Sequence, residues 1–421
     1  MNRKKITPIT SRCLVTLLSA VCAISIPLSG AEGLRLLPES AEALGKVGGR
    51  IANLSDPSVV RLNPANLSLI EGTEFMISTS VLHGSTDYTS PGGATASMGA
   101  PWKYSGAIYL ATNPADSPWA FGMGISSPFG LDIRWASDFQ FNLANESKLI
   151  PIAFSPGASY QLSDCLTVGF GFDLTWSQLE FTQNYPWFSV IPGSPTGVQK
   201  LKGEGWGFAP VASIAWDMDE RQRVSVVARA PMKTDYKGSY KVSNIPAPLT
   251  PVFASESVFR SEIEQPGSIG IGYSVDIKDD LRIGFDFEWI QNSTHDDIPI
   301  DIGANQLLLN GNDRVVLDWE NSWNLGWGIE ADVTECLTAR GGYMYSKSPM
   351  PDQTFTPAVP ANDRHLISTG LGLKHGCGTI DFAYLLGIYE DRDVRNNQVA
   401  AYNGDWEFMW HQFTLSYTRK F

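Results

Sequence analysis

The sequence predicts an all-β fold: a transmembrane antiparallel β-barrel of about fourteen strands, with an N-terminal segment plugging its lumen. Three observations point to it. Segments of alternating apolar and polar residues recur, short and long connections alternate, and the chain starts with a leader typical of exported proteins. Strands of about ten residues cross a bilayer at a tilt, and lipid requires that every backbone polar group be paired within the protein. A closed barrel meets that requirement.

Residues 1–31 have the three parts of a secretory signal peptide. A basic start reaches Arg12, an apolar core covers residues 13–28, and Ser29-Gly30-Ala31 supplies small residues for cleavage. The alternative is an N-terminal membrane anchor. No later segment is a continuous apolar run of the ~18 residues that a spanning helix needs.

Residues 32–72 lack the pattern of a strand. Pro57 and Pro64 each remove a backbone donor and fix φ, so neither fits the middle of a sheet. Asn63 precedes a proline and is therefore biased towards an extended or turn conformation. We interpret residues 32–72 as a compact, irregular plug, called the hatch, and residues 73–421 as the wall built around it.

After the hatch, the apolar pattern has a period of two, as in strands whose side chains point alternately to opposite faces. The clearest example is residues 166–177, where large apolar side chains alternate with small, polar or acidic ones. Residues 281–289 and 323–332 repeat the pattern. A soluble β-sandwich also alternates, but its polar face favours Lys, Glu and Thr and its apolar face carries fewer aromatic residues at its ends. The composition favours an apolar face in contact with lipid.

The alternation predicts fourteen strands, and their connections alternate in length. The strands are expected to begin near Thr73, Lys103, Trp119, Leu149, Cys165, Gly205, Gln222, Arg260, Asp280, Asn321, Cys336, His365, Thr379 and Glu407. Long connections follow the odd-numbered strands, the pattern of outer-membrane barrels with short periplasmic turns and long outer loops. The chain stops at Phe421, and a terminal aromatic residue on an alternating strand is similar to the insertion signal of such barrels. We expect a multi-pass barrel in a bacterial outer membrane.

Several stretches resemble the FadL-type outer-membrane transporters of long-chain fatty acids and other hydrophobic compounds, among them residues 122–131, 317–326, 342–352 and 357–365. In the hatch, Asp56 and Ser58 are followed by Asn63-Pro64-Ala65. Further on, Pro128-Phe129-Gly130 is similar to the kink that interrupts the third strand of the family. The likeness is collinear over residues 32–421. It implies passive uptake of a hydrophobic compound, with capture by outer loops, movement of the hatch and lateral diffusion through the wall at the kink.

Two outer loops have the composition expected for capture of an apolar molecule. Residues 185–192 and 245–253 are rich in apolar residues and stiffened by proline. An exposed apolar groove between them would bind a hydrophobic ligand. The candidate capture residues are Trp187, Phe188, Ile191, Leu249 and Phe253. The alternative is that the loops pack on each other and bind nothing.

A fatty acid also needs a cation for its carboxylate. Strand parity places Arg229, Arg282 and Arg340 on the lumen face, and these are the candidate carboxylate-binding residues. Each would otherwise pair with a luminal acid such as Asp286 or Glu330. The basic ligand-binding positions of the family have no residue-by-residue match here. A neutral or aromatic hydrocarbon is therefore the alternative cargo.

The sequence offers no catalytic or cofactor motif, and we expect no cofactor, no bound metal and no enzyme activity. The net charge of −13 argues against nucleic-acid binding. Cys165, Cys336 and Cys377 remain after the leader, with no pairing assigned. Alternatives from other classes are an outer-membrane lipid hydrolase, which would use a His such as His411, and a structural or adhesin barrel. The expected partners are a hydrophobic small molecule, outer-membrane lipid and the barrel-insertion machinery, and the chain is expected to be a monomer.

Overall fold

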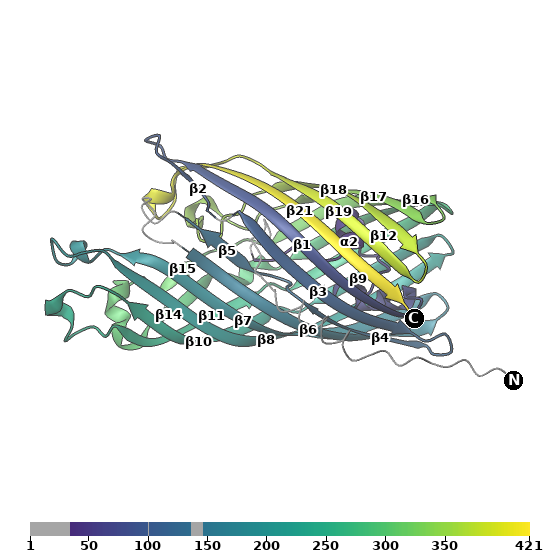
Figure 1. Ribbon diagram of the computed structural model, residues 1–421, viewed down its shortest axis with the longest axis horizontal. Coiled ribbons are helices and arrows are strands. Elements are labelled where there is room, and N and C mark those ends of the chain that lie inside the picture. Colours follow the sequence, from purple (N-terminus) through teal and green to yellow (C-terminus); the bar gives the residue numbers. More distant parts are fainter. Residues whose placement is uncertain (1–33, 100, 136–145) are drawn as a thin grey trace.

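The computed structural model describes residues 34–99, 101–135 and 146–421. Fourteen wall strands form a closed antiparallel barrel, and the hatch, described from Leu34 on, lies within it (Figure 1). The predicted fold class is confirmed. No helix within the described ranges is long and apolar enough to cross a membrane. The predicted signal peptide, residues 1–31, lies outside these ranges.

Each wall strand pairs with its neighbours in sequence, and the last pairs with the first from Glu74 opposite Lys420 to Thr89 opposite Asp405. Three wall strands are interrupted, so each consists of two elements. In chain order the wall contains β1 (Gly72–Thr89), β3 (Trp102–Asn113), β4 (Trp119–Ser126) with β5 (Leu131–Arg134), β6 (Glu146–Ser163), β7 (Leu166–Tyr185), β8 (Gly197–Asp219), β9 (Gln222–Arg229) with β10 (Met232–Val242), β11 (Glu256–Gln265) with β12 (Ser268–Lys278), β13 (Leu281–Ile290), β16 (Ser322–Thr334), β17 (Leu337–Ser346), β18 (Arg364–His375), β19 (Gly378–Tyr389) and β21 (Gly404–Lys420).

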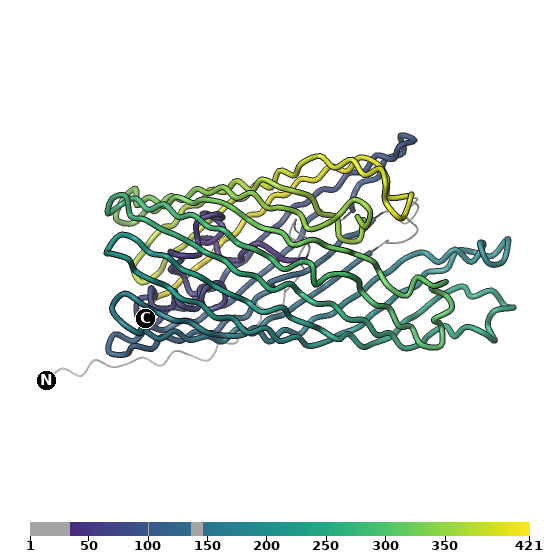
Figure 2. Tube along the Cα trace, turned by 180° about the vertical axis from the view of Figure 1, so that it is seen from behind, coloured from purple at the N-terminus to yellow at the C-terminus, as the bar shows by residue number. Residues whose placement is uncertain are grey.

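The hatch and the loops hold the remaining elements. The hatch contains α2 (Ala41–Gly45), α3 (Val59–Leu62) and the 3-10 helix η1 (Pro64–Leu69). The loops contain β2 (Thr95–Ser97), β14 (Asp297–Asp301), β15 (Arg314–Val316), β20 (Arg392–Val394), η2 (Trp187–Ser189), η3 (Ala247–Leu249), η4 (Asn292–Thr294), η5 (Gly303–Leu309), η6 (Asp352–Thr354) and η7 (Ala400–Tyr402). Figure 2 shows the hatch inside the barrel, towards the end with the short turns.

The outward face of β8 shows how the sequence pattern fits a bilayer. Side chains from Trp206 to Trp216 alternate between exposed outward positions and buried luminal ones. This apolar belt of about eleven residues matches the span needed for a tilted strand and ends in a tryptophan on each side. Beyond Trp206 the outward side chains are charged, including Lys200, Lys202 and Glu204. The strand therefore continues out of the membrane.

That extension accounts for one error in the predicted strand starts. The sixth wall strand was expected near Gly205, but it begins at Gly197. The prediction followed the apolar outward face, and above the membrane the outward face of β8 is charged. The interruptions at Ala230-Pro231 and Pro266-Gly267 were also not predicted, although two prolines within strand-like segments were a signal for them.

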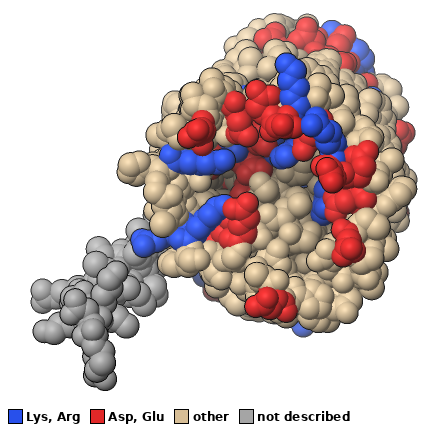
Figure 3. Space-filling view, turned by 90° about the vertical axis from the view of Figure 1, so that its right-hand side faces the viewer, with Lys and Arg blue, Asp and Glu red and all other residues tan. Residues whose placement is uncertain are grey.

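The two ends of the barrel differ in their chemistry. Figure 3 shows the end with the short turns, where acidic and basic side chains surround a hollow. Ion pairs there include Arg221 with Asp279 at 2.8 Å and Lys420 with Glu71 at 2.7 Å. The three cysteines lie in short turns at this end, exposed and unpaired.

The Asn63-Pro64-Ala65 segment of the hatch lies directly against the wall, and a glycine permits this. A Cβ on Gly169 of β7 would be 2.1 Å from the Ala65 nitrogen and 2.4 Å from the Pro64 carbonyl carbon. The Ala65 amide donates to the Ser213 hydroxyl at 2.8 Å. Only a residue without a side chain fits at position 169.

We therefore predict that Gly169→Ala displaces this part of the hatch, at a cost of about 1–3 kcal/mol from overpacking. Hydrogen exchange at the Ala65 amide should become faster while the barrel stays folded. Gly106→Ala is the matched control, because its Cβ would lie 3.5 Å from the nearest atom. Equal exchange rates in the two variants would contradict the close contact.

Candidate functional site

The Asp56-x-Ser58 pattern folds the hatch onto itself. The Asp56 carboxylate accepts hydrogen bonds from the Ser58 amide at 2.8 Å, from the Ser58 hydroxyl at 2.5 Å and from the Ser40 hydroxyl. Ser40 caps α2, since its hydroxyl oxygen accepts from the Ala43 amide at 3.1 Å. Burial and the nearby Glu42 carboxylate raise the pKa of Asp56 to about 7. These residues define the shape of the hatch.

Asn63 links the hatch to the wall. Its side-chain amide donates to the Ile51 carbonyl and to the Ser225 hydroxyl, both at 2.7 Å. Pro64 then opens η1 at a position where a missing N–H costs nothing. The Asn-Pro-Ala pattern therefore has a structural reason: the Asn reaches β9 and the Pro turns the chain along β7.

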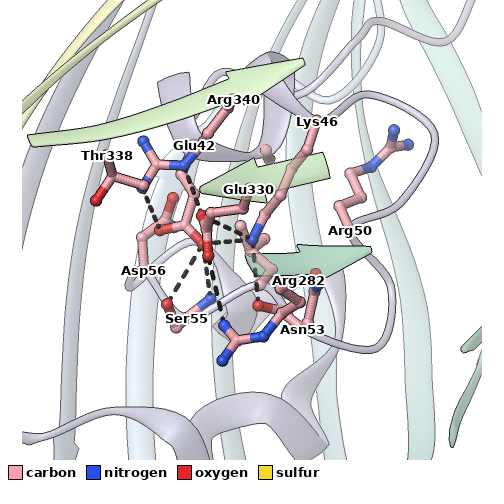
Figure 4. A network of polar contacts seen from close by, with 12 residues as sticks. Glu42, Lys46, Arg50, Asn53, Ser55, Asp56, Arg282, Glu330, Thr338 and Arg340 are labelled. Atoms are coloured by element: carbon pink, nitrogen blue, oxygen red, sulfur yellow. Dashed lines mark hydrogen bonds and ion pairs between the residues drawn. The ribbon is translucent and has the colours of Figure 1, made fainter. Parts of the chain in front are cut away.

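A buried network of charges, the ionic anchor, fixes α2 to the opposite wall (Figure 4). Lys46 lies 3.0 Å from Glu42 and 3.3 Å from Glu330 of β16. Arg340 of β17 is 2.7 Å from Glu330 and 2.6 Å from Asp381, and Arg282 is 3.4 Å from Glu330. Two of the three predicted carboxylate-binding arginines, Arg282 and Arg340, therefore face the lumen and pair with Glu330, which binds Lys46 of the hatch. Breaking such a buried group by removing one partner costs about 3–5 kcal/mol.

The third wall strand is interrupted between β4 and β5, where Pro128-Phe129-Gly130 was expected to form a kink. The start of the hatch fills the gap. The Leu36 amide donates to the Pro128 carbonyl at 3.2 Å, and the Gly130 amide donates to the Leu34 carbonyl at 2.8 Å. Arg35 and Phe129 thus form an antiparallel bridge. Backbone groups that the wall leaves unpaired are paired by the hatch.

Glu39 is a second contact between the hatch and the kink. Its carboxylate accepts from the Ser127 amide at 2.6 Å, and the Tyr109 hydroxyl lies 3.5 Å away. Burial raises the pKa of Glu39 from 4.5 to about 7, although the Arg61 charge opposes this. A charged carboxylate is therefore disfavoured at this position.

A cavity of about 930 Å³, measured with its open mouth, lies between the hatch, the kink and the wall. Apolar side chains line part of it, including Ile51, Phe129 and Met232. Its charged lining comprises four arginines and only two carboxylates, an excess of two positive charges. These are Arg35, Arg50, Arg61, Arg229, Asp173 and Glu288.

The arginines are held in place by the carboxylates. Arg229 pairs with Asp173, which also lies 3.6 Å from Arg61, so one carboxylate serves two guanidinium groups. Arg35 is 2.9 Å from Glu288. Asp173 also accepts from the Ser155 hydroxyl at 2.5 Å. Of the three predicted carboxylate-binding residues, Arg229 is the one that lines this cavity.

Sequence reasoning missed Arg35, Arg61 and Glu39 as residues of this region. All three lie in the irregular hatch, where no periodicity indicates which way a side chain points. The number of ionisable residues in the hatch could have indicated these contacts. Burying a charge inside a barrel is costly unless the charge is paired, so each such residue implies a partner.

The predicted capture residues differ in how deeply they are buried. Trp187 is fully buried, packs on Tyr185 with ring centroids 4.4 Å apart, and lies 6.3 Å from the Phe253 ring. Leu249 and Phe253 are partly buried against the same core, whereas Phe188 is exposed. Ile191 is half-buried. The loops thus pack on each other at Trp187.

His411 lies on the outer face of the wall. Its Nδ1 atom is 2.9 Å from the Tyr384 hydroxyl, and the His83 ring centroid lies 6.0 Å away. Within the described ranges, no serine or carboxylate is hydrogen-bonded to it. Nothing in this arrangement favours the hydrolase alternative.

The sequence matches the family described as outer membrane protein transport protein (OMPP1/FadL/TodX) over residues 22–421. A 47 kDa outer membrane protein of Pasteurella multocida is 23% identical over 394 residues, covering 86% of this chain and 88% of its relative. A long-chain fatty acid transport protein of Salmonella typhi is 22% identical over 382 residues, covering 84% and 86%.

Solved structures share the fold. A FadL homologue of Pseudomonas aeruginosa superposes with a TM-score of 0.81 at 18% identity, covering 92% of this chain and 99% of the homologue. The toluene transporter TbuX of Ralstonia pickettii gives a TM-score of 0.68 at 17% identity, covering 93% and 99%. With the barrel, the hatch and the match over nearly the whole sequence, the chain belongs to the OMPP1/FadL/TodX family of outer-membrane transport proteins.

Proposed function

We propose that this protein takes up long-chain fatty acids passively across the outer membrane. The observation that carries the proposal is the cavity beside the kink, which combines an apolar lining with an excess of positive charge. An aliphatic chain matches the apolar part, and a carboxylate is the simplest ligand to balance the excess arginines. A purely neutral cargo would not balance the excess positive charge.

The proposed route passes the hatch at its weakest point. The run from Leu34 to Leu36 is joined to the kink by two backbone hydrogen bonds, while α2 is held by the ionic anchor. Cargo in the cavity contacts Phe129 and Arg35 and competes with that run for the same space. Its displacement would leave the gap between β4 and β5 as a lateral exit into the membrane.

A neutral aromatic hydrocarbon is the second candidate cargo. Asp173 and Glu288 already pair with arginines of the cavity, so part of the positive charge is balanced without a ligand. The two candidates differ in one property that can be measured, the dependence of binding on a carboxylate.

We predict that Arg229→Gln weakens binding of dodecanoate by about 10- to 100-fold, because a charge-assisted hydrogen bond is lost. Dodecanol binding should hardly change. Asp173→Asn should act in the opposite direction, since it frees Arg229 and Arg61 for the cargo. Calorimetric titration of the detergent-solubilised barrel measures all three.

Arg221→Gln is the matched control, because Arg221 pairs with Asp279 at an exposed turn far from the cavity. Equal affinity of the original protein and both cavity variants for dodecanoate would exclude the carboxylate role and leave the neutral cargo.

We also predict that the hatch detaches more readily as the pH rises. Glu39 has a raised pKa, so its contribution to docking is complete at low pH and is lost as the pH rises through about 7. A spin label at the half-buried hatch residue Leu36, with the native cysteines changed to serine, should become more mobile between pH 5 and pH 7.

Glu39→Gln should reduce this pH dependence, leaving the part that Asp56 contributes with its own raised pKa. Glu71→Gln is the control, since the hydrogen bond and charge of Lys420 lower the pKa of Glu71 and its titration falls outside that range. An unchanged pH profile in Glu39→Gln would show that Glu39 does not couple the hatch to the kink.

A further inference from the structure

Three neighbouring outer loops form one lobe whose ends carry no charge. Residues 181–199, 242–255 and 302–312 contain no Asp, Glu, Lys or Arg. They are joined by hydrogen bonds from Trp187 to the Ser243 carbonyl at 2.9 Å and from Tyr185 to the Leu308 carbonyl at 3.2 Å. We call these three stretches the outer tip. The β7–β8 and β10–β11 loops are the parts that reach furthest from the hatch in Figures 1 and 2.

Large apolar side chains are exposed on the outer tip. The exposed fractions are 49% for Phe188, 53% for Val190, 58% for Val252 and 76% for Leu307. Trp187, by contrast, is completely buried and packs near Phe253 between the loops. The apolar residues that remain exposed therefore lie outside the packed interior of the lobe. Soluble surfaces rarely gather such residues without a partner.

The membrane that holds the barrel does not reach this surface. The apolar belt of β8 ends at Trp206, and a collar of charged side chains follows on β8, β10 and β11. Ion pairs in the collar include Lys233 with Glu262 at 2.6 Å and Arg260 with Asp301 at 2.9 Å. Charged groups of both signs remain in water, so the tip beyond them faces the medium.

The outer tip is also stiff. Prolines occur on both sides of its exposed apolar residues, at Pro186, Pro192, Pro195, Pro246, Pro248 and Pro251. Each fixes one φ angle. Hydrogen bonds between Asn305 and Ala254, at 2.7 and 3.0 Å, hold the third stretch to the second. Little ordering is needed when the tip meets a partner, which favours binding.

We propose that the outer tip docks on the surface of an uncharged lipid particle in the medium, from which the cargo is drawn. The outer tip and such a surface match in charge and shape. The tip is rigid and apolar and has no ionised side chain that would lose its hydration on entering a surface without net charge. The inference deepens the proposed function by naming the source of the cargo. The identity of the cargo depends on the proposed function, whereas docking can be measured independently of it.

The test uses the full-length mature barrel in nanodiscs, mixed with phosphatidylcholine vesicles and separated by flotation. The triple variant Val190→Ser, Val252→Ser, Leu307→Ser should lose about tenfold or more of vesicle binding, because three apolar side chains no longer leave water. Val399→Ser, which changes an exposed valine beside η7, is the matched control and should bind as the original does. Raising the salt from 0.1 to 1 M should leave binding unchanged.

An uptake assay with two sources of fatty acid then distinguishes docking from transport. The triple variant should take up dodecanoate supplied from cyclodextrin at the original rate, and should be slow only when the fatty acid is supplied in vesicles. Vesicle binding that survives the triple change, falls equally in Val399→Ser or weakens with salt would overturn the docking. The docking would also be overturned if the outer tip bound a second copy of the chain or another protein and did not bind vesicles. Failure of the unaltered protein to take up dodecanoate from cyclodextrin, with docking intact, would instead refute the proposed function.

Discussion

The structure depends on one constraint: within a bilayer, every backbone N–H and C=O group of the wall needs a partner inside the protein. The third wall strand fails this requirement between β4 and β5. The hatch meets it, through the bonds that join Leu36 to Pro128 and Gly130 to Leu34. The wall is therefore complete only while the first residues of the hatch stay in place. A plug that merely filled the lumen would not have this consequence.

The hatch is held unequally along its length. Its α2 end is joined to the wall by the ionic anchor, which includes residues of four strands and has Glu330 between Lys46 and Arg340. Its first residues are held by two backbone bonds, each worth about 1 kcal/mol, by Glu39 and by the partly exposed ion pair of Arg35 with Glu288. Removing a partner from the buried ionic group costs several times as much. Local detachment should therefore begin at Leu34 and stop before Lys46, so that the plug as a whole need not leave the barrel.

Strand parity explains what the sequence could predict. It gave the face of Arg229, Arg282 and Arg340 correctly, because side chains alternate along each strand whatever they contact. Parity does not predict how far along the barrel axis a side chain lies or which residue it contacts. Arg35 and Glu288 are 253 positions apart, and nothing local to either residue indicates that they meet. In the hatch, which has no period, even the facing direction of Glu39 and Arg61 was beyond sequence reasoning. The start of β8 was misplaced for a related reason, since the outward face changes from apolar to charged where the strand leaves the membrane.

The interruptions of the wall indicate where the proposed exit would open. β4 and β9 are each eight residues long and end just before Ser127 and Ala230, and both breaks line the same cavity. A strand needs about ten residues to cross the bilayer. The β9 break lies near the middle of the apolar belt, because the Ala230 amide donates to the Pro210 carbonyl of β8, about midway between Trp206 and Trp216. Because both breaks line one cavity, cargo that left it there would pass directly into the apolar layer of the membrane.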